Sequence, residues 1–103
     1  MAMRTESQNE KIMIETLHIL VSGRVQGVFY RASARAEAQR IGLNGFVTNC
    51  SDGRVEIVAQ GHTDKLAQFI KWCWQGPISA KVDDVRTNVI ATDEKFVDFQ
   101  IRH

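Results

Sequence analysis

The chain has 103 residues, of which 44% are hydrophobic and 24% are charged, so it holds enough apolar residues for one core and one domain. Thirteen Lys and Arg against twelve Asp and Glu give a formal net charge of +1, without the basic excess that favours binding to nucleic acid or anionic membranes. No apolar run approaches the ~18 residues of a membrane span, and the polar N-terminus lacks the apolar stretch of a secretory signal, so we expect a cytoplasmic protein.

The first half of the chain predicts a strand, a glycine-containing loop and a helix. Residues 1–13 are expected to form a polar, flexible tail ahead of a domain over residues 14–103. Apolar residues alternate along residues 17–22, which predicts the first strand. Residues 23–29 contain two glycines, and the Ala-rich segment 31–41 has high helix propensity and stops at a glycine.

A hairpin and a second helix follow. Residues 45–49 and 54–60 have strand patterns, and Ser51-Asp52-Gly53 between them is typical of a tight turn. Thr63 and Asp64 suit a helix start, and the apolar stripe behind them ends at Gly76-Pro77. This stripe consists of Leu66, Phe69, Ile70 and Cys73.

The remaining residues complete the predicted fold. Residues 82–89 form an irregular strand pattern, and Val97, Phe99 and Ile101 alternate with polar residues near the terminus. The order is βαββαβ, with a further short strand at the end. It predicts an α+β protein, a ferredoxin-like sandwich with two helices packed on one face of a mainly antiparallel sheet.

Cysteine and histidine give no support to a metal site or to a Ser/His/Asp hydrolase. Cys50 and Cys73 lie too far apart for a CxxC motif, so we expect two free thiols, buried or half-buried. His18, His62 and His103 are scattered without ligand or triad spacing. We therefore expect no metal and no cofactor.

The junction between the first strand and the first helix breaks two local rules. The residues from Gly27 to Tyr30 offer no N-cap side chain, and Arg31 places a cation in the first turn, where the helix dipole disfavours it. A bound anion resolves both anomalies, because Gly23 and Gly27 let backbone amides approach a phosphate and the guanidinium can hold two of its oxygens. The alternative is a glycine turn followed by a solvent-exposed arginine.

Asn49 stands at the end of the second strand, just before the turn. Asn is common there for conformational reasons alone. Its amide could also orient a water beside a phosphate, if the fold brings this strand end to the first loop. The sequence leaves both interpretations open.

The segments Gly23–Arg31 (GRVQGVFYR) and Gly45–Asn49 (GFVTN), with Gly53, Val55 and Gly61 downstream, closely resemble the two signature segments of the acylphosphatase family. The similarity runs from about Leu17 to Arg102 and leaves only the polar tail outside. Tyr30 stands where the family more often has Phe, Phe46 where Trp is frequent, and Thr48 where a longer or basic side chain is usual. None of these departures removes a catalytic group.

The resemblance implies hydrolysis of the carboxyl-phosphate bond of small acyl phosphates to a carboxylate and inorganic phosphate, the latter both product and inhibitor. It implies that Arg31 and loop amides bind the phosphoryl group and that Asn49 places the attacking water. The carboxylate leaving group has a conjugate acid with a pKa of about 4, so it departs without a strong general acid. We expect a metal-independent monomer. The implied phosphate-binding residues are Gln26, Gly27, Val28, Phe29, Tyr30 and Arg31.

RNA binding is an alternative. Trp72 and Trp74 could form a stacking platform, and residues 45–47 are similar to a fragment of the RNA-recognition motif. The basic and aromatic spacing of that motif is missing, which argues against RNA binding. We expect the two tryptophans to cover the edge of the core instead.

Two further alternatives concern acidic pairs and larger proteins. Asp83-Asp84 and Asp93-Glu94 could be paired carboxylates or a cation site, but they lack a third ligand, and solvated loop or edge positions explain them better. The same fold also occurs as an accessory domain of carbamoyl-handling maturation proteins. A related hypothesis is that the chain is a binding module that has kept the phosphate site but lost turnover. The length of the chain favours a free-standing enzyme.

Overall fold

The structure, a computed structural model, describes residues 13–103; the predicted flexible tail lies outside the described residues except for Met13. The predicted order of elements, βαββαβ followed by a short last strand, is confirmed. The strands are β1 (Ile14–Arg24), β2 (Asn44–Asn49), β3 (Val55–His62), β4 (Lys81–Val89) and β5 (Phe99–Arg102), and the helices are α2 (Tyr30–Ile41) and α3 (Thr63–Gln75).

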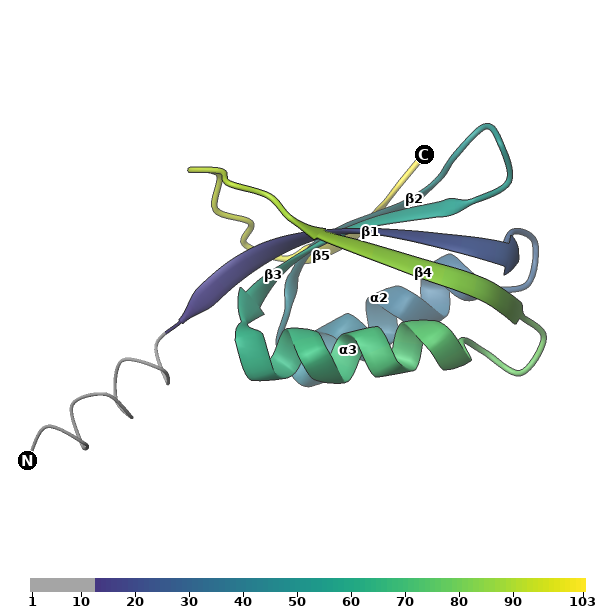
Figure 1. Cartoon of the computed structure of the whole chain (residues 1–103), viewed down its shortest axis with the longest axis horizontal. Coiled ribbons are helices and arrows are strands. Elements are labelled where there is room, and N and C mark those ends of the chain that lie inside the picture. Colours follow the sequence, from purple (N-terminus) through teal and green to yellow (C-terminus); the bar gives the residue numbers. More distant parts are fainter. Residues whose placement is uncertain (1–12) are drawn as a thin grey trace, which may run out of the picture.

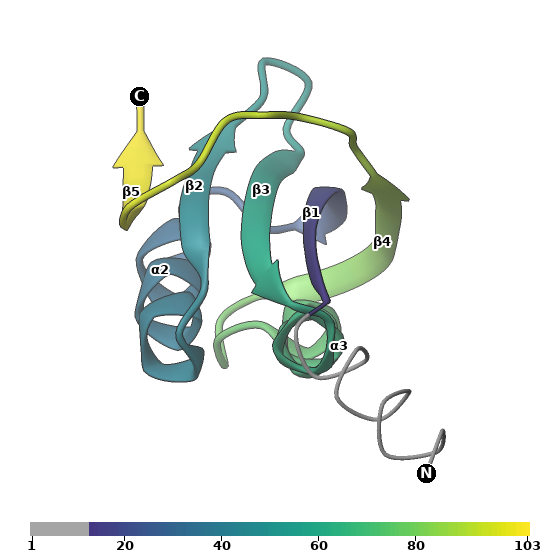
Figure 2. The same cartoon turned by 90° about the vertical axis from the view of Figure 1, so that its left-hand side faces the viewer.

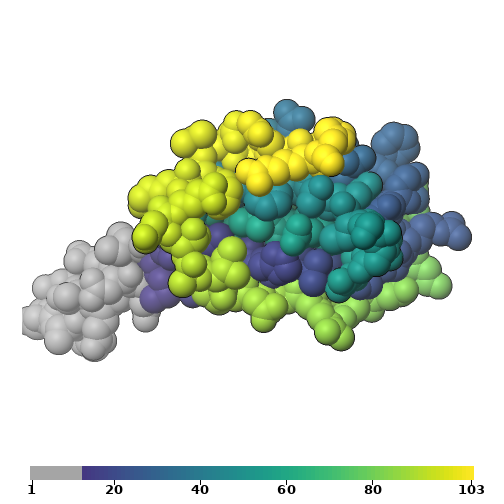
Figure 3. Space-filling view, turned by 90° about the horizontal axis from the view of Figure 1, so that it is seen from above, coloured from purple at the N-terminus to yellow at the C-terminus, as the bar shows by residue number. Residues whose placement is uncertain are grey.

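The strands form one sheet in the order β4-β1-β3-β2-β5. Strand β1 pairs antiparallel with β3 and β4, and β2 pairs antiparallel with β3, whereas β2 and β5 run parallel. Both helices lie on one face (Figure 1), and the strands and the β4–β5 connection form the opposite surface (Figure 3). The predicted ferredoxin-like α+β sandwich is therefore confirmed.

The core lies between this sheet and the two helices. Ala34 and Ala38 are fully buried in α2, and because their side chains are small the helix can lie close to the sheet. The predicted stripe of α3 buries Leu66, Phe69 and Cys73. Among the described residues, neither helix has the length and apolar character to cross a membrane.

Both helices begin close to the predicted positions. Helix α2 starts at Tyr30, one residue earlier than expected, because Phe29 takes the left-handed N-cap position. Strand β3 runs to His62, whose Nδ1 accepts a hydrogen bond from the Asp64 amide at 3.4 Å. His62 is therefore the N-cap of α3, and Thr63 and Asp64 lie in the first helical turn.

Residues 90–98 connect β4 at one edge of the sheet to β5 at the other (Figure 2). Gln60 fixes this connection, because its side-chain amide donates to the Glu94 carbonyl at 2.8 Å and its Oε1 accepts from the Phe96 amide at 3.0 Å. The last strand starts only at Phe99, so the predicted alternation was wrong at Val97, which is 87% exposed. The reason is that the connection must still cross the sheet at that point.

Candidate functional site

A cavity of about 290 Å³ lies where the β1–α2 connection, the end of β2 and the C-terminal segment meet. Its lining combines two polar side chains singled out in the sequence, Arg31 and Asn49, with several apolar ones. The residues that line it are Val25, Gly27, Phe29, Tyr30, Arg31, Ala32, Asn49, Ile101 and His103. The fold thus brings the first loop and the end of β2 together, which the sequence had left open.

The β1–α2 connection turns sharply from the sheet into α2. Gly23 lies at a register shift between β1 and β4, and a Cβ there would collide with the Lys81 carbonyl. Gly27 has a φ of 73°, a left-handed conformation that glycine adopts without strain. Val25 is fully buried between them and anchors the loop to the core. This anchoring holds the loop amides in one place beside the cavity.

The first backbone amides of α2 lack a side-chain acceptor from the N-cap residue, as expected from the sequence. Its N-cap, Phe29, makes no side-chain cap hydrogen bond, and the first turn contains no acidic residue. The Ser33 amide donates to the Phe29 carbonyl at 3.0 Å, so the amides before it have no acceptor within the helix. These amides and the helix dipole make this end of α2 a favourable place for an anion.

Arg31 reaches the cavity from the first turn of α2. Its side chain is half-buried, and its Nη1 lies 3.2 Å from Nδ1 of His103. The imidazole can accept from the guanidinium when Nδ1 carries no proton. This contact leaves other guanidinium N–H groups available for an anion, and Arg presents five donors in a planar fork.

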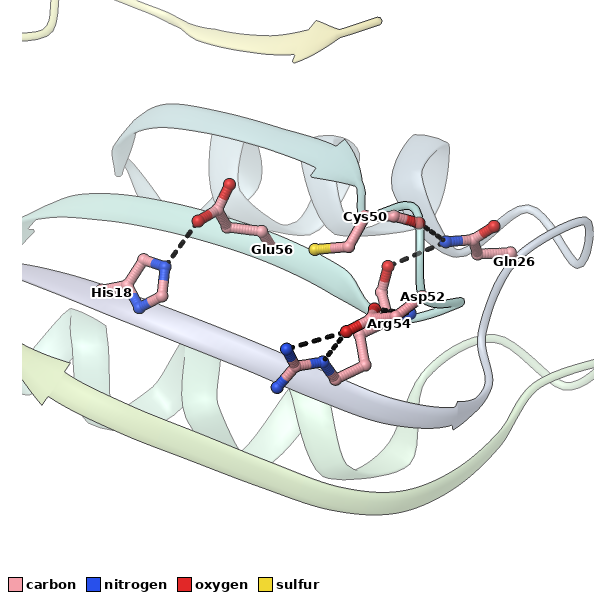
Figure 4. Close-up of polar contacts among 6 residues, drawn as sticks. All are labelled: His18, Gln26, Cys50, Asp52, Arg54 and Glu56. Carbon is pink, nitrogen blue, oxygen red and sulfur yellow. Dashed lines mark hydrogen bonds and ion pairs between the residues drawn. The ribbon is translucent and has the colours of Figure 1, made fainter.

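Gln26 ties the first loop to the β2–β3 hairpin (Figure 4). Its Nε2 donates to the carbonyls of Cys50 and Arg54, each at 2.8 Å. The hairpin itself is closed by the Cys50 amide, which donates to the Arg54 carbonyl at 2.8 Å. Because Cys50 directly follows Asn49, this pair of bonds fixes the loop amides relative to the Asn49 backbone.

The hairpin turn has its own polar support. Asp52 accepts from the Arg54 amide at 3.1 Å and from its Nε at 2.9 Å (Figure 4). The Arg54 guanidinium lowers the pKa of the Asp52 carboxyl through this hydrogen bond. Burial, together with the charges of Glu56 and Asp52, raises the pKa of the Cys50 thiol, so it is mostly neutral near neutral pH. Cys50 is also not among the residues that line the cavity.

Asn49 ends β2, where it pairs with Val55 of β3, and its side chain lines the cavity. Its Oδ1 is buried and has no hydrogen-bond partner among residues 13–103. A buried acceptor without a partner costs about 1–3 kcal/mol unless a water or a ligand satisfies it. Asn49 therefore lines the same cavity as Arg31 and carries a buried acceptor without a partner among the described residues.

The other predicted phosphate-binding residues are placed in different ways. Gly27, Phe29 and Tyr30 line the cavity, whereas the Gln26 side chain is bound to the hairpin and Val28 packs against the core. The Tyr30 side chain is buried, and its hydroxyl donates to the Cys73 carbonyl at 2.8 Å. Burial raises the pKa of this phenol, so it stays neutral. Binding to phosphate through the amides of these residues stays a prediction.

His103 and Ile101 also line the cavity, although no sequence pattern marks them as site residues. They stand far from Arg31 along the chain, and only the parallel pairing of β5 with β2 brings them to the cavity. His103 contacts Arg31 directly. A single histidine at a chain terminus carries no motif, so only the strand order could have revealed it.

The remaining candidates stay outside the cavity. Among residues 13–103 there is no group of three or more His, Cys, Asp or Glu that could hold a metal ion. Asp84 lies on the edge strand β4 and pairs with Arg86, and Asp93 is exposed in the β4–β5 connection, so the prediction of solvated edge and loop positions is confirmed.

The structure also tests the predictions for the two thiols and the two tryptophans. Cys50 and Cys73 are free, one half-buried and the other buried, as expected. Trp72 packs against the core beside Phe69, with ring centroids 6.0 Å apart, which confirms its place at the core edge. Trp74 is 49% exposed and covers less of the core than predicted, because it points away from the apolar stripe of α3.

Comparisons with known proteins identify the family to which the chain belongs. A family model described as Acylphosphatase matches residues 17–101. An acylphosphatase of Marinobacter nauticus is 47% identical over 90 residues, covering 87% of this chain and 98% of its own length. The structure of an acylphosphatase from Coxiella burnetii has 42% identity and a TM-score of 0.83, covering 86% of this chain and 93% of that chain. The crystal structure of an acylphosphatase from Bacillus subtilis has 36% identity and a TM-score of 0.84, covering 88% of this chain and 100% of that chain.

These matches extend over most of the chain, and the family match includes the β1–α2 connection and the end of β2. The chain therefore belongs to the acylphosphatase family. Its function is that of an acylphosphatase, a hydrolase that acts on small acyl phosphates.

Proposed function

We propose that hydrolysis takes place in the 290 Å³ cavity, with Arg31 and loop amides holding the phosphoryl group and Asn49 orienting the attacking water. One observation carries this proposal. Asn49, whose buried Oδ1 has no partner among the described residues, lines the same cavity as Arg31 at the start of α2.

The phosphoryl group would bind at the start of α2. The loop amides of Gln26, Gly27, Val28, Phe29 and Tyr30 supply donors, and the guanidinium supplies a planar fork that can hold two oxygens at once. In phosphoryl transfer the oxygens around phosphorus carry the charge of the transition state, so fixed donors stabilise it without any covalent step. The half-buried position of Arg31 and its contact with His103 support such a fixed geometry.

The attacking water would donate a hydrogen bond to Asn49 Oδ1. That bond satisfies the buried acceptor and turns a lone pair of the water oxygen toward phosphorus. The bond between water and phosphorus forms as the bond between phosphorus and the acyl oxygen breaks, and the carboxylate leaves with the electron pair. Since the conjugate acid of this leaving group has a pKa of about 4, no general acid is required.

The finer properties of the enzyme belong to the same proposal. We propose a monomer in the cytoplasm that needs no metal, with inorganic phosphate as product and competitive inhibitor. The stable leaving group supports metal independence, because a Lewis acid has no difficult charge to neutralise on the acyl oxygen. A cavity of about 290 Å³ suits a small molecule better than a nucleic acid.

The test is release of phosphate from acetyl phosphate and benzoyl phosphate by the purified chain and its variants. Arg31→Ala should lose both turnover and inhibition by phosphate, and Arg31→Lys should recover little, because Lys lacks the planar fork. Arg35→Ala, one helical turn later and outside the cavity lining, is the matched control. Equal inhibition constants for phosphate in the wild type and Arg31→Ala would place the phosphate site elsewhere.

Asn49→Ala separates orientation of water from binding of phosphate. We expect kcat to fall by about 10² to 10³, which corresponds to roughly 3 to 4 kcal/mol, and inhibition by phosphate to change little. Asn88→Ala on the exposed edge strand β4 is the control. If Asn49 serves only the strand end, its loss should lower stability by about 1 kcal/mol and leave kcat within about threefold of wild type.

A further inference from the structure

Phe29 combines two features that are unfavourable in a soluble protein. Its side chain is 78% exposed, although a phenyl ring gains free energy when it is removed from water. Its φ of 67° is also positive, and among residues 13–103 it is the one such residue that is not glycine. Glycine would adopt this conformation without strain, so the backbone does not explain a phenylalanine here.

The residues around Phe29 indicate which part of a ligand its ring would meet. It lines the cavity with Arg31 and Asn49, and the apolar side chains of Ala32 and Ile101 line the same space. The polar groups suit the phosphoryl end of a substrate, and the apolar groups suit a hydrocarbon group joined to it. An acyl phosphate has these two ends in one small molecule.

The size of the cavity fits such a substrate. An apolar cavity of about 150 Å³ can hold a benzene molecule. The cavity here has a volume of about 290 Å³, which leaves space for a phosphoryl group beside a ring of that size. Aromatic rings in contact prefer offset or edge-to-face packing, and Phe29 lines the cavity with its side chain 78% exposed, so an incoming ring can reach it.

We propose that Phe29 determines the acyl specificity of this enzyme: its ring packs on the acyl group of the substrate and favours acyl phosphates with an aromatic or other bulky apolar group. This inference rests on the proposed function, because it takes the phosphoryl group to be bound at Arg31. It assigns the side chain of Phe29 a role separate from that of its amide.

The test compares two substrates that share the phosphoryl group and differ in the acyl group, benzoyl phosphate and acetyl phosphate. The variant is Phe29→Gly, which removes the ring and accepts the positive φ. We expect the ratio of kcat/KM for benzoyl phosphate to kcat/KM for acetyl phosphate to fall about tenfold, mainly through KM, which corresponds to about 1.4 kcal/mol. Ile78→Ala, which removes another exposed apolar side chain that is not part of the cavity lining, should leave the ratio unchanged.

Several outcomes would overturn the inference. An equal loss on both substrates would show that Phe29 acts only on the phosphate cradle, and an unchanged ratio would show that the ring does not contact the acyl group. Thermal unfolding of Phe29→Gly shows that the variant is folded, and we expect its Tm to be at least that of the wild type, since strain is relieved. Failure of the wild type to hydrolyse either substrate would instead refute the proposed function itself.

Discussion

Replacing Gln26 by Leu tests whether the tie between the first loop and the hairpin serves catalysis. The change removes two hydrogen bonds of 2.8 Å, to the carbonyls of Cys50 and Arg54. Each such bond contributes about 0.5–1.5 kcal/mol net. Both carbonyls keep a backbone donor, the amides of Gly53 and Cys50, so neither becomes an unpaired buried acceptor. We therefore expect the free energy of unfolding to fall by about 1–3 kcal/mol.

The expected effect on turnover is larger than the effect on stability. Without the tie, the loop amides and Asn49 can shift relative to each other, and a displacement of about 1 Å in an active site can reduce the rate by about 10². We expect kcat of Gln26→Leu to fall by about 10- to 100-fold. Urea denaturation gives the stability, and steady-state hydrolysis of benzoyl phosphate gives kcat.

A matched control is Gln39→Leu. Gln39 also donates to a backbone carbonyl, that of Phe99 at 3.4 Å, but it lies outside the cavity lining. This variant should lose no more than a few tenths of a kcal/mol and keep its kcat. A folded Gln26→Leu enzyme with kcat within threefold of wild type would refute the reasoning that this tie positions the two halves of the site.

Three further predictions concern metal, the Arg31 contact and alkaline pH. Exhaustive EDTA treatment should leave hydrolysis of acyl phosphate unchanged, and activity restored only by Mg²⁺ or Zn²⁺ would contradict the metal-free mechanism. His103→Ala removes the contact to Arg31 Nη1 and should raise the inhibition constant for phosphate by about threefold, since an exposed hydrogen bond of this kind contributes about 0.5–1 kcal/mol; an unchanged constant would exclude a positioning role. Burial raises the pKa of the Cys73 thiol from 9.0 to about 12, so its contribution to stability is present below pH 9 and is lost as the pH rises toward 12. Thermal unfolding at a series of pH values should show a shallower alkaline loss for Cys73→Ala, and identical profiles would contradict this.

The parts of the fold with strong periodicity could be predicted from the sequence. The stripe of α3 identified its buried side, because residues three and four apart share one face of a helix. Ser51-Asp52-Gly53 located the hairpin turn. The last strand was less predictable, because Val97 and Phe99 alternate in the sequence whereas only Phe99 pairs with β2. An apolar residue in a crossing connection has the same local pattern as one in a strand.

Local rules also pointed to part of the candidate site. The missing N-cap and the cation in the first turn of α2 singled out Arg31 from the sequence, and the structure shows no side-chain cap at Phe29. The proximity of Asn49 to this loop depends on the strand order, which no local pattern encodes. The same applies to His103 and to the two long-range bonds of Gln26, whose side chain has no periodicity that marks it as a tie.

The most direct test of the account is a crystal structure of the protein soaked in inorganic phosphate. We predict one phosphate in the cavity, within hydrogen-bond distance of the Arg31 guanidinium and of amides of the loop before it, with a water on Asn49 Oδ1. A phosphate bound elsewhere, with Arg31 still paired only to His103, would contradict the central claim.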